Sequence, residues 1–352
     1  MKRTGGNGAM RFGLIGYGLW GKYHARAIVN APGAELAAIA CASEQTAAQA
    51  RADFPLLPVV IGYQALLAQQ GQLGLNAVDI VVPNYLHAGI GIAALDAGLD
   101  VLLEKPMAPS LAECDALIAA ARRNDRVLTI GHEFRLSGQW GGMKKIIEGG
   151  EIGRPRYGNV SLFRFPYRPG SSAWRYDQSR VGSWILEEPV HFFDSLMWYF
   201  QSEGDPVSVH AVGNSKQDMP GMYDNFSTVL RWPGDLYAVV TQTLSGFEHH
   251  HVMEVTGTEG SIRTWWSGSM DRTSDPKFEL KVQRRGGKQC EIVGDLGASG
   301  EVFELQEELR LVVEAFRARR PLVSPEEARK RIVVCVEAER SVRENRVVEL
   351  RF

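Results

Sequence analysis

The chain has 352 residues, which at roughly 150 residues per domain predicts two domains. Apolar residues make up 45% of it and charged residues 23%, which excludes a disordered or fibrous protein. The net charge is only −2, from 39 Lys and Arg against 41 Asp and Glu. Such a chain has no broad positive field, so we expect neither nucleic acid nor a membrane as a partner.

Targeting and redox features are also weak. No apolar run approaches the roughly 18–20 residues that span a bilayer. Residues 1–10 are polar and glycine-rich, so we interpret them as a loose extension and not as a secretory signal. The four cysteines are far apart, which argues against a disulfide framework or a zinc knuckle. We therefore expect a cytoplasmic protein.

The first part of the chain alternates between strand-like and helix-like patterns. Short runs of Val, Ile and Leu predict strands at 11–15, 35–41, 78–82, 101–104 and 127–131. Segments with helical spacing lie between them, at 21–30, 44–53, 87–97 and 110–124. Strands that alternate with helices predict a parallel, doubly wound α/β sheet, here a Rossmann domain over residues 1–131.

The pattern changes after Gly131. Segments of alternating polarity predict a mostly antiparallel sheet, with strands at 157–165, 207–212, 225–232, 237–244, 251–257, 260–265 and 347–352. Two late helices are expected at 301–319 and 325–343, the second capped by Ser324 with Glu327 three residues later. We therefore place a second α/β domain, for substrate binding and oligomerisation, at residues 132–352.

A glycine-rich segment follows the first strand and opens the first helix. It has the spacing G-x-G-x-x-G and consists of Gly16, Tyr17, Gly18, Leu19, Trp20 and Gly21. In this context the glycines allow a tight turn, close approach of a pyrophosphate, and close packing of helix on strand. The segment therefore predicts a dinucleotide-binding site.

The end of the second strand does not decide which dinucleotide binds. Cys41 stands where an acidic residue would hold the ribose 2′-hydroxyl of NAD. Glu44 can reach back to the ribose, and Ser43 either binds a phosphate or simply caps the next helix. Since we find no nearby cation for a 2′-phosphate, NAD is favoured over NADP.

Several short motifs, taken in order, give the chain a resemblance to a known family. They are Pro83–His87, Glu104-Lys105-Pro106, Gly131–Arg135, Gly149–Gly153, Trp174-Arg175 and Gly182–Asp194. Together they resemble the Gfo/Idh/MocA family of oxidoreductases. This resemblance implies a Rossmann domain followed by a domain with a large open sheet, whose exposed face forms homodimers or homotetramers. It also implies NAD(P)-dependent oxidation of a sugar, inositol or similar polyol.

Oxidation of a hydroxyl by hydride transfer needs a cation at the oxygen and a base for the proton. Lys105 ends a parallel strand, where ligands of such sheets bind, and its ammonium can polarise the hydroxyl. Pro106 allows a cis peptide bond, which the resemblance suggests aims the lysine. His191 is the expected base, and Glu187 lies four residues before it. Pro189 belongs in a first turn, so the helix should begin near Glu187 or Glu188.

The resemblance also assigns supporting residues. Family members usually carry Asp-x-Gly-x-His where this chain has Glu187-x-Pro189-x-His191. Asp194 either supports the imidazole or is structural. The expected cofactor contacts beyond the glycine loop are Ser43, Glu44, Pro83, Asn84, His87, Glu104, Lys105, Trp174 and Arg175. The expected substrate contacts are Lys105, Glu133, Arg135, Arg164, Arg175, Glu187 and His191.

Other functions stay open beside this one. Some relatives use a tightly held NAD for transient oxidation during glycoside hydrolysis, and a regulator that binds cofactor without catalysis is a third possibility. His249-His250-His251 does not predict a metal site, because adjacent strand residues point to opposite faces. We therefore expect no metal.

Overall fold

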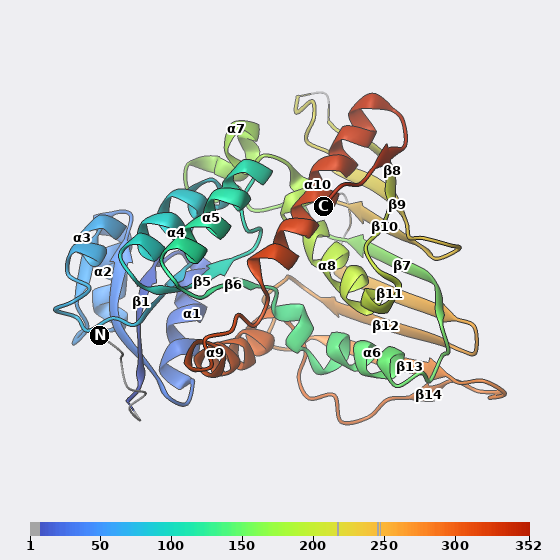
Figure 1. Cartoon of the computed structure of the whole chain (residues 1–352), viewed down its shortest axis with the longest axis horizontal. Coiled ribbons are helices and arrows are strands. Elements are labelled where there is room, and N and C mark those ends of the chain that lie inside the picture. The colour runs from blue at the N-terminus through green and yellow to red at the C-terminus, as the bar shows by residue number, and fades with distance from the viewer. Residues whose placement is uncertain (1–7, 217, 245, 247) are drawn as a thin grey trace. The chain divides into compact units, whose positions relative to one another are not determined.

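The structure is a computed structural model that describes residues 8–352 except 217, 245 and 247. The chain divides into two units (Figure 1). The first contains residues up to His132 together with Leu305–Arg329, and the second contains Glu133–Glu304 and Lys330–Phe352. The expected boundary near residue 131 agrees with the first division. Residues 305–329, which we expected in the second domain, instead pack with the first.

The first unit is built on a parallel six-stranded sheet, sheet A. Its strand order is β3-β2-β1-β4-β5-β6, the order of a doubly wound Rossmann domain. The strands are β1 (Met10–Ile15), β2 (Ala34–Cys41), β3 (Val59–Ile61), β4 (Ala77–Ile80), β5 (Asp100–Glu104) and β6 (Leu128–Gly131). The helices before residue 132 are α1 (Leu19–Asn30), α2 (Glu44–Asp53), α3 (Tyr63–Ala68), α4 (His87–Asp96) and α5 (Leu111–Arg123). The predicted fold class is confirmed, although we did not predict β3 and α3.

A late helix completes the core of this unit. The C-terminal part of α9 (Glu301–Arg317) places five apolar side chains in the same buried cluster as β1, β2, α1 and α2: Leu305, Leu309, Val312, Val313 and Phe316. The ring of Phe316 stacks on that of Phe12 in β1, with 6.1 Å between the centroids. Strand β1 therefore buries its side chains partly against a helix that is made almost 300 residues later.

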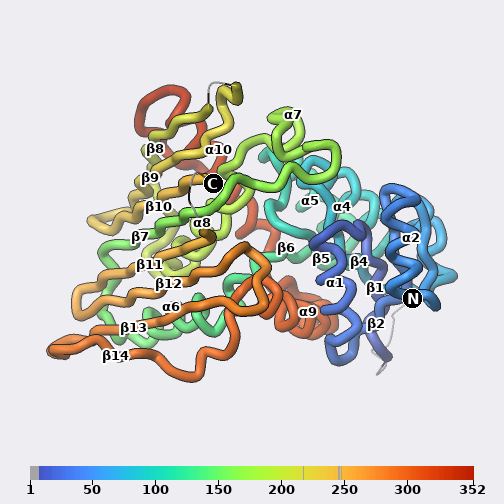
Figure 2. Tube along the Cα trace, turned by 180° about the vertical axis from the view of Figure 1, so that it is seen from behind, coloured from blue at the N-terminus to red at the C-terminus, as the bar shows by residue number. Residues whose placement is uncertain are grey.

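The second unit is built on a nine-stranded sheet, sheet B. Its order is β14-β13-β12-β11-β7-β10-β9-β8-β15, and Figure 2 shows these strands from behind. All pairs are antiparallel except β7 with β10. The strands are β7 (Pro155–Phe163), β8 (Ser208–Asn214), β9 (Asn225–Arg231), β10 (Tyr237–Thr243), β11 (His249–Gly257), β12 (Ser261–Gly268), β13 (Lys277–Gln283), β14 (Glu291–Ile292) and β15 (Val348–Glu349). The mostly antiparallel sheet is confirmed, but β13 and β14 were not predicted.

Helices cover one face of sheet B. They include α6 (Gly138–Glu148) and α8 (Pro189–Tyr199), and the unit also contains α7 (Gln178–Val181) and most of α10 (Pro325–Glu344). A Cβ on Gly158 of β7 would lie 2.8 Å from Leu196 of α8, so this strand packs closely under the helix. In β11, His249, His251 and Met253 are buried, whereas the alternate residues His250, Val252 and Glu254 are only half-buried.

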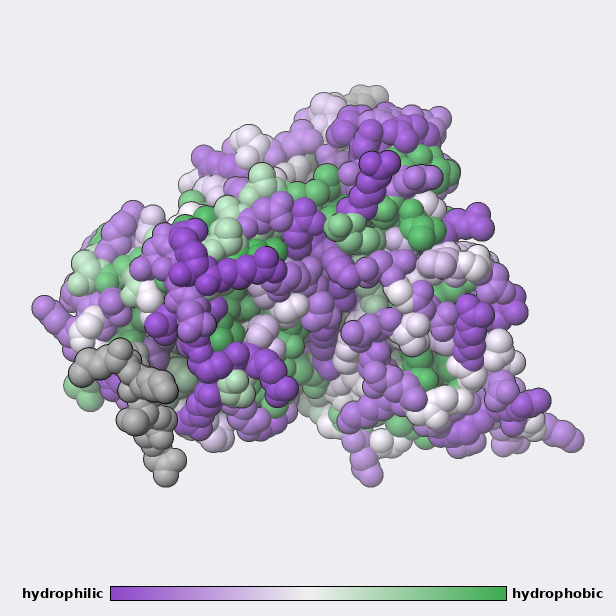
Figure 3. All heavy atoms as spheres, in the orientation of Figure 1, coloured by the Kyte–Doolittle hydropathy of each residue, from purple (hydrophilic) through white to green (hydrophobic). Residues whose placement is uncertain are grey.

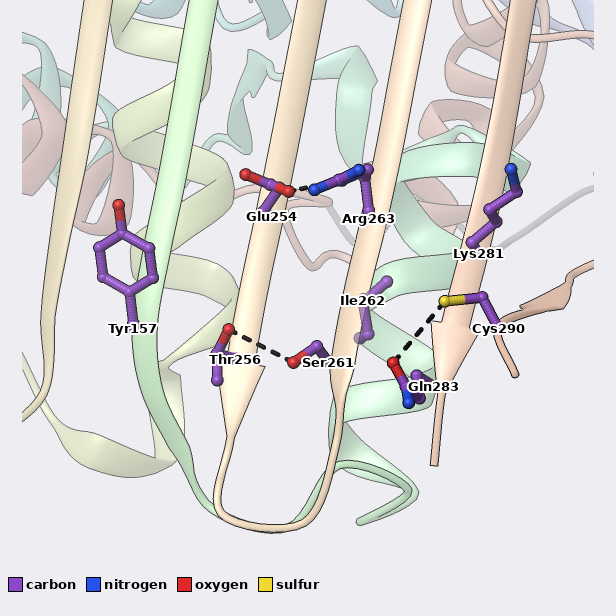
Figure 4. A pocket seen from close by; sticks show the side chains of 9 residues that line it. All are labelled: Tyr157, Glu254, Thr256, Ser261, Ile262, Arg263, Lys281, Gln283 and Cys290. Atoms are coloured by element: carbon purple, nitrogen blue, oxygen red, sulfur yellow. Dashed lines mark hydrogen bonds and ion pairs between the residues drawn. The ribbon is translucent and has the colours of Figure 1, made fainter. Parts of the chain in front are cut away.

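The opposite face of sheet B carries polar side chains. Figure 4 shows Glu254, Arg263 and Lys281 on the neighbouring strands β11, β12 and β13, with Glu254 and Arg263 joined as an ion pair. On the face of the molecule drawn in Figure 3, hydrophilic residues cover most of the described surface. Among the described helices, none combines the length and the apolar character that crossing a membrane requires.

Candidate active site

Two glycines in the loop between β1 and α1 are required by close backbone contacts. Gly16 has a φ of +106°, and a Cβ there would lie 2.1 Å from the carbonyl oxygen of Val81. A Cβ on Gly21 would lie 2.1 Å from the carbonyl oxygen of Gly16. Because both neighbours are main-chain atoms, only glycine allows this turn and this approach of α1 to the loop.

Gly18, between these two, faces open space. A Cβ there would meet no atom within 4 Å, and Gly18 is the N-cap of α1 with no side-chain capping bond. The start of α1 therefore presents main-chain N–H groups and the positive end of the helix dipole to this space. The loop fits the pyrophosphate of a dinucleotide.

The larger side chains of the loop hold it in place. The hydroxyl of Tyr17 is turned into the protein and donates to Oδ2 of Asp53 at 2.7 Å. Trp20 Nε1 donates to Oε1 of Glu104 at 3.0 Å, while the Leu19 side chain is exposed. The main chain of the loop glycines, and not the side chains of Tyr17 and Trp20, is therefore the part that fits the cofactor.

Glu104 belongs to a buried charge cluster beneath the loop. Nδ1 of His24 lies 2.7 Å from Oδ2 of Asp79, and Nε2 lies 3.0 Å from Oε1 of Glu104. Burial alone would lower the pKa of His24, but the two carboxylates outweigh it and raise the pKa to about 10. Burial opposes ionisation of Glu104, yet His24, Lys105 and Trp20 together lower its pKa to about 2. An imidazolium paired with carboxylates thus fixes the residue that precedes Lys105.

A second carboxyl group in this cluster holds a proton. Glu308 of α9 is fully buried, and burial together with the negative charge of Glu104 raises its pKa to about 8. We did not predict that His24, Asp79 or Glu308 lie here. Their positions in the chain are far apart, so no local motif marks them.

The helix that follows β2 contains a cation, Arg51, that we did not expect. Ser43 is the N-cap of α2, and its hydroxyl accepts a hydrogen bond from the Thr46 N–H at 3.3 Å. Glu44 forms an ion pair with Arg51, which lies two turns further along α2 on the same face. The capping role of Ser43 is therefore observed, and the contacts of Ser43 and Glu44 with a cofactor stay predictions.

The segment after β4 is tied to the segment after β5. Both ring nitrogens of His87 lie near main-chain carbonyl oxygens, Nδ1 at 2.8 Å from Pro106 and Nε2 at 2.9 Å from Val82. His87 and Asn84 are buried, so His87 acts first as a link between two loops. The predicted contacts of Pro83, Asn84 and His87 with nicotinamide ribose stay predictions.

Lys105 follows the last residue of β5, and the Lys105–Pro106 peptide bond is cis. In a parallel sheet the carboxyl ends of all strands lie at one edge. Lys105 therefore shares an edge of sheet A with the glycine loop after β1, two strands away.

The expected base lies in the second unit, at the start of α8. Pro189 is the first residue of this helix and Glu188 its N-cap, which confirms the predicted start. The His191 side chain is buried, its ring stacks on Phe134 at 4.4 Å, and its Nε2 lies 3.8 Å from Oε1 of Glu133. Glu133 can therefore stabilise the imidazolium that forms when His191 accepts a proton.

Three other predicted residues lie together in this unit. Glu187 accepts a hydrogen bond from Nε of Arg175 at 2.6 Å. The Arg175 guanidinium lies over the ring of Trp174, 4.4 Å from its centroid. Arg175 and Glu187 remain partly accessible, with 28% and 10% of their side chains exposed, so both can meet a ligand.

Arg135 is engaged elsewhere. Its Nε and a terminal nitrogen donate to the two carboxylate oxygens of Asp194 at 2.8 and 2.6 Å. Arg331 donates to the same carboxylate at 2.8 Å. Asp194 therefore pairs with two arginines, which favours the structural alternative of the two that we considered. The predicted contact of Arg135 with substrate stays a prediction.

Arg164 is also buried, in an ion pair with Glu188. Its guanidinium lies 4.6 Å from the ring centroid of Tyr167 and 3.8 Å from a carboxylate oxygen of Asp271. We did not predict a role for Glu188, although it stands directly between Glu187 and Pro189. Two adjacent carboxylates before a helix were the only local signal.

Comparison with known proteins identifies both units. Residues 10–132 match the family described as "Oxidoreductase family, NAD-binding Rossmann fold", and residues 141–263 match the "GFO/IDH/MocA C-terminal domain". A D-xylose 1-dehydrogenase [NADP(+)] of Haloarcula marismortui is 26% identical over 74% of each chain. An inositol 2-dehydrogenase of Corynebacterium glutamicum is 26% identical over 77% of this chain and 78% of its own.

Solved structures share the fold over nearly the whole chain. An aldose-aldose oxidoreductase from Caulobacter crescentus superposes with a TM-score of 0.83 at 20% identity, covering 97% of this chain and all of its own. A levoglucosan dehydrogenase in complex with NADH and levoglucosan has a TM-score of 0.81 at 22% identity, covering 98% of this chain and all of its own.

Proposed function

Since this chain belongs to the Gfo/Idh/MocA family of oxidoreductases, we propose that it oxidises a secondary hydroxyl of a cyclic polyol, sugar or glycoside. It is an NAD(P)-dependent dehydrogenase with an NAD-binding Rossmann domain at residues 10–132. The substrate class is supported by the names of relatives, which include xylose, inositol and levoglucosan dehydrogenases. One observation carries the proposal. Lys105 lies at the same edge of sheet A as the glycine loop Gly16–Gly21, where Gly18 faces open space.

Lys105 acts on the reacting oxygen in this proposal. Its ammonium donates a hydrogen bond to the substrate hydroxyl and stabilises the negative charge that develops as the proton leaves. The ion cluster of His24, Asp79 and Glu104 holds the preceding residue, and the His87 link holds the following proline. Little reorganisation is then needed at Lys105 during the reaction. The nicotinamide cofactor, when bound, supplies the hydride acceptor.

His191 receives the proton from the same hydroxyl. It is the general base, and the carboxylate of Glu133 stabilises its charged form. The stacking of its ring on Phe134 restricts rotation of the imidazole. Glu133 is therefore a positioning residue in this proposal, and its direct contact with substrate stays a prediction.

Glu187 and Arg175 bind other hydroxyl groups of the substrate. The carboxylate accepts hydrogen bonds and the guanidinium donates them, so the pair can engage two neighbouring hydroxyls of a ring. Glutamate is one methylene longer than the aspartate usual in the family. The Glu187 carboxylate therefore extends farther than that of the usual aspartate, and the pair binds substrate hydroxyl groups at a different position.

The test is a substrate panel. Inositols, aldoses and glycosides are assayed with NAD and with NADP, and NAD(P)H formation is followed by absorbance. We expect turnover of at least one cyclic polyol or sugar, with a higher kcat/KM for NAD. No reduction of either cofactor across the whole panel would contradict the proposed substrate class.

The same panel separates the alternative functions. A glycoside hydrolase that oxidises its substrate only transiently would release sugar without net NADH. A regulator without catalysis would bind cofactor but convert nothing. A clear preference for NADP would implicate Arg51 and Ser43 in binding the 2′-phosphate.

We also propose that the chain forms a homodimer or homotetramer through the polar face of sheet B. This follows the family pattern, and Glu254, Arg263 and Lys281 on that face offer both signs of charge for a self-complementary contact (Figure 4). Light scattering after size exclusion tests it, and a monomer at micromolar concentration would contradict it. A cytoplasmic location stays a prediction.

A further inference from the structure

A second cluster of buried polar residues lies in sheet B and the segment before α8. His249 Nε2 is 2.9 Å from Oε1 of Glu188, and His251 Nε2 is 3.5 Å from the same oxygen. The two imidazole Nε2 atoms are 2.6 Å apart. All three residues are at most 4% exposed. Three potential ligand atoms from two distant parts of the chain therefore converge on one point.

Hydrogen bonds alone cannot pair all three of these atoms well. At 2.6 Å, only one of the two imidazole nitrogens can carry a hydrogen between them, and the other must present its lone pair. The Glu188 carboxylate already forms an ion pair with Arg164. A carboxylate and a neutral imidazole are the forms that bind a metal ion.

We propose that Glu188, His249 and His251 bind a divalent transition-metal ion, with Zn²⁺ as the representative. Two imidazole nitrogens and one carboxylate oxygen are a common zinc ligand set. Ligands about 2.1 Å from a tetrahedral ion lie roughly 3.4 Å from one another. One of the three observed separations, 3.5 Å, is close to this value. The other two, 2.6 and 2.9 Å, are shorter, so the side chains must move apart slightly to admit the ion.

The surroundings support the same ion. Arg164 pairs with Oε2 of Glu188, which leaves Oε1 for the metal and orients the carboxylate. Arg164 and Glu188 cancel in charge, and Asp271 nearby is paired with Arg168 at 3.3 Å. Arg272, which also faces this region, pairs with Glu301 at 3.4 Å.

A fourth ligand has a place as well. His249 and His251 line a small pocket together with Asp271 and Glu301. Its volume of about 10 Å³ is close to the space of one water molecule. The rings of Trp266 and Phe192 lie 5.4 and 5.2 Å from the ring of His251 and exclude further solvent. The bound ion would be structural and would join β11 to the start of α8.

The prediction that the three adjacent histidines do not share one ion is consistent with this site. Strand alternation puts His249 and His251 on the covered face and His250 on the other. The third ligand, Glu188, comes from a residue 61 positions earlier in the chain. The expectation of no metal considered only the three neighbours, and residue spacing alone could not add Glu188.

The experiment measures metal content in the full-length protein without a histidine tag. All variants carry Cys290→Ser, since Cys290 is an exposed free thiol that could bind metal by itself. After removal of metal with a chelator, Zn²⁺ or Co²⁺ is titrated and bound metal is measured by mass spectrometry. We expect about one equivalent of metal per chain, and an unfolding temperature that rises with free Zn²⁺.

Variants locate the site. Glu188→Gln, His249→Gln and His251→Gln should each lose most of the bound metal. His250→Gln is the matched control, because it changes the same residue type on the opposite face of β11, and it should keep one equivalent. Equal metal uptake by His249→Gln, His251→Gln and His250→Gln would overturn the proposal.

A spectrum of the parent protein covers the case in which a ligand variant fails to fold. The Co²⁺-loaded protein should show visible bands of a four-coordinate site, and X-ray absorption should show two imidazole ligands. Absence of tight metal binding, or a bound metal without imidazole ligands, would likewise overturn the proposal.

Discussion

Lys105 is the residue whose replacement should most directly separate chemistry from binding. Lys105→Met keeps the bulk and removes the cation, so kcat should fall by about 10²–10³, typical of losing one charge-stabilising donor. The dissociation constant of NAD should change little, because the substitution does not alter the glycine loop Gly16–Gly21. Steady-state kinetics and cofactor titration measure the two effects, with exposed Lys145→Met as the control. Near-normal turnover, with the chemical step rate-limiting, would remove Lys105 from the mechanism.

Replacement of His191 should also lower kcat. His191→Asn keeps part of the hydrogen bonding but removes the base, for which we expect a decrease in kcat of about 10²–10⁴. Combined with Lys105→Met, the loss should be smaller than the product of the single effects, because both residues act on one oxygen. Glu133→Gln should reduce kcat less, since Glu133 acts through His191. A larger effect of Glu133→Gln than of His191→Asn would reverse these roles.

Glu308 makes the stability of the protein depend on pH. Its folded pKa of about 8 lies above the ordinary value of about 4.5, so the folded state holds an extra proton between these values. The resulting stability is complete below about pH 4.5 and is lost as the pH rises through about 8. Glu308→Gln is neutral at every pH and should become more stable relative to the parent as the pH rises from 5 to 9.

Unfolding temperatures across this pH range test the effect of Glu308. The difference between variant and parent isolates it from His24, Asp79 and Glu104, which titrate in the same cluster. Glu314→Gln on the exposed side of α9 is the control and should give a difference that is flat with pH. A flat difference for Glu308→Gln as well would show that Glu308 is ionised in the folded protein.

At the scale of elements, the start of α10 depends on Ser324 as its side-chain N-cap. The Ser324 hydroxyl accepts from the Glu327 N–H at 3.2 Å and lies 3.3 Å from the Glu327 carboxylate. Ser324→Ala should lower the free energy of unfolding by about 0.5–2 kcal/mol. Ser324→Asp retains an acceptor and should restore most of it. Urea denaturation measures both, and an unchanged midpoint in Ser324→Ala would show that the cap contributes nothing.

Local patterns of this kind are what the sequence reveals well. The Ser324–Glu327 cap, the start of α8 at Pro189 and the strand–glycine loop–helix of β1 and α1 all depend on neighbouring residues. The short strand β3 and the edge strand β14 were missed because three or two residues carry no measurable periodicity. Motif order pointed to Lys105 and His191, whereas the partners of His24, Glu188 and Asp194 come from distant segments that no spacing rule connects.

At the scale of the molecule, the first unit is not continuous in sequence. Five apolar side chains of α9 complete its core, and each such burial contributes about 1.5–3 kcal/mol. Their sum is on the order of 10 kcal/mol, as large as the typical net stability of a domain, about 5–15 kcal/mol. A fragment that ends at His132 should therefore fail to unfold cooperatively in urea.

The matching experiment adds the missing segment. A fragment in which residues 305–329 are joined to residue 132 by a flexible linker should regain cooperative unfolding and NAD binding. Cooperative folding of the short fragment alone would show that α9 is dispensable for sheet A.

The dependence of β1 on α9 also has a consequence on the ribosome. Translation proceeds at about 5–20 residues per second, so residues 133–304 are synthesised over roughly ten seconds or more after sheet A has emerged. Throughout this interval Phe12 and its neighbours lack their partner Phe316. The nascent chain thus exposes an aggregation-prone apolar surface for longer than a domain that is continuous in sequence. The yield of the protein in cells should therefore depend on chaperones that bind nascent chains.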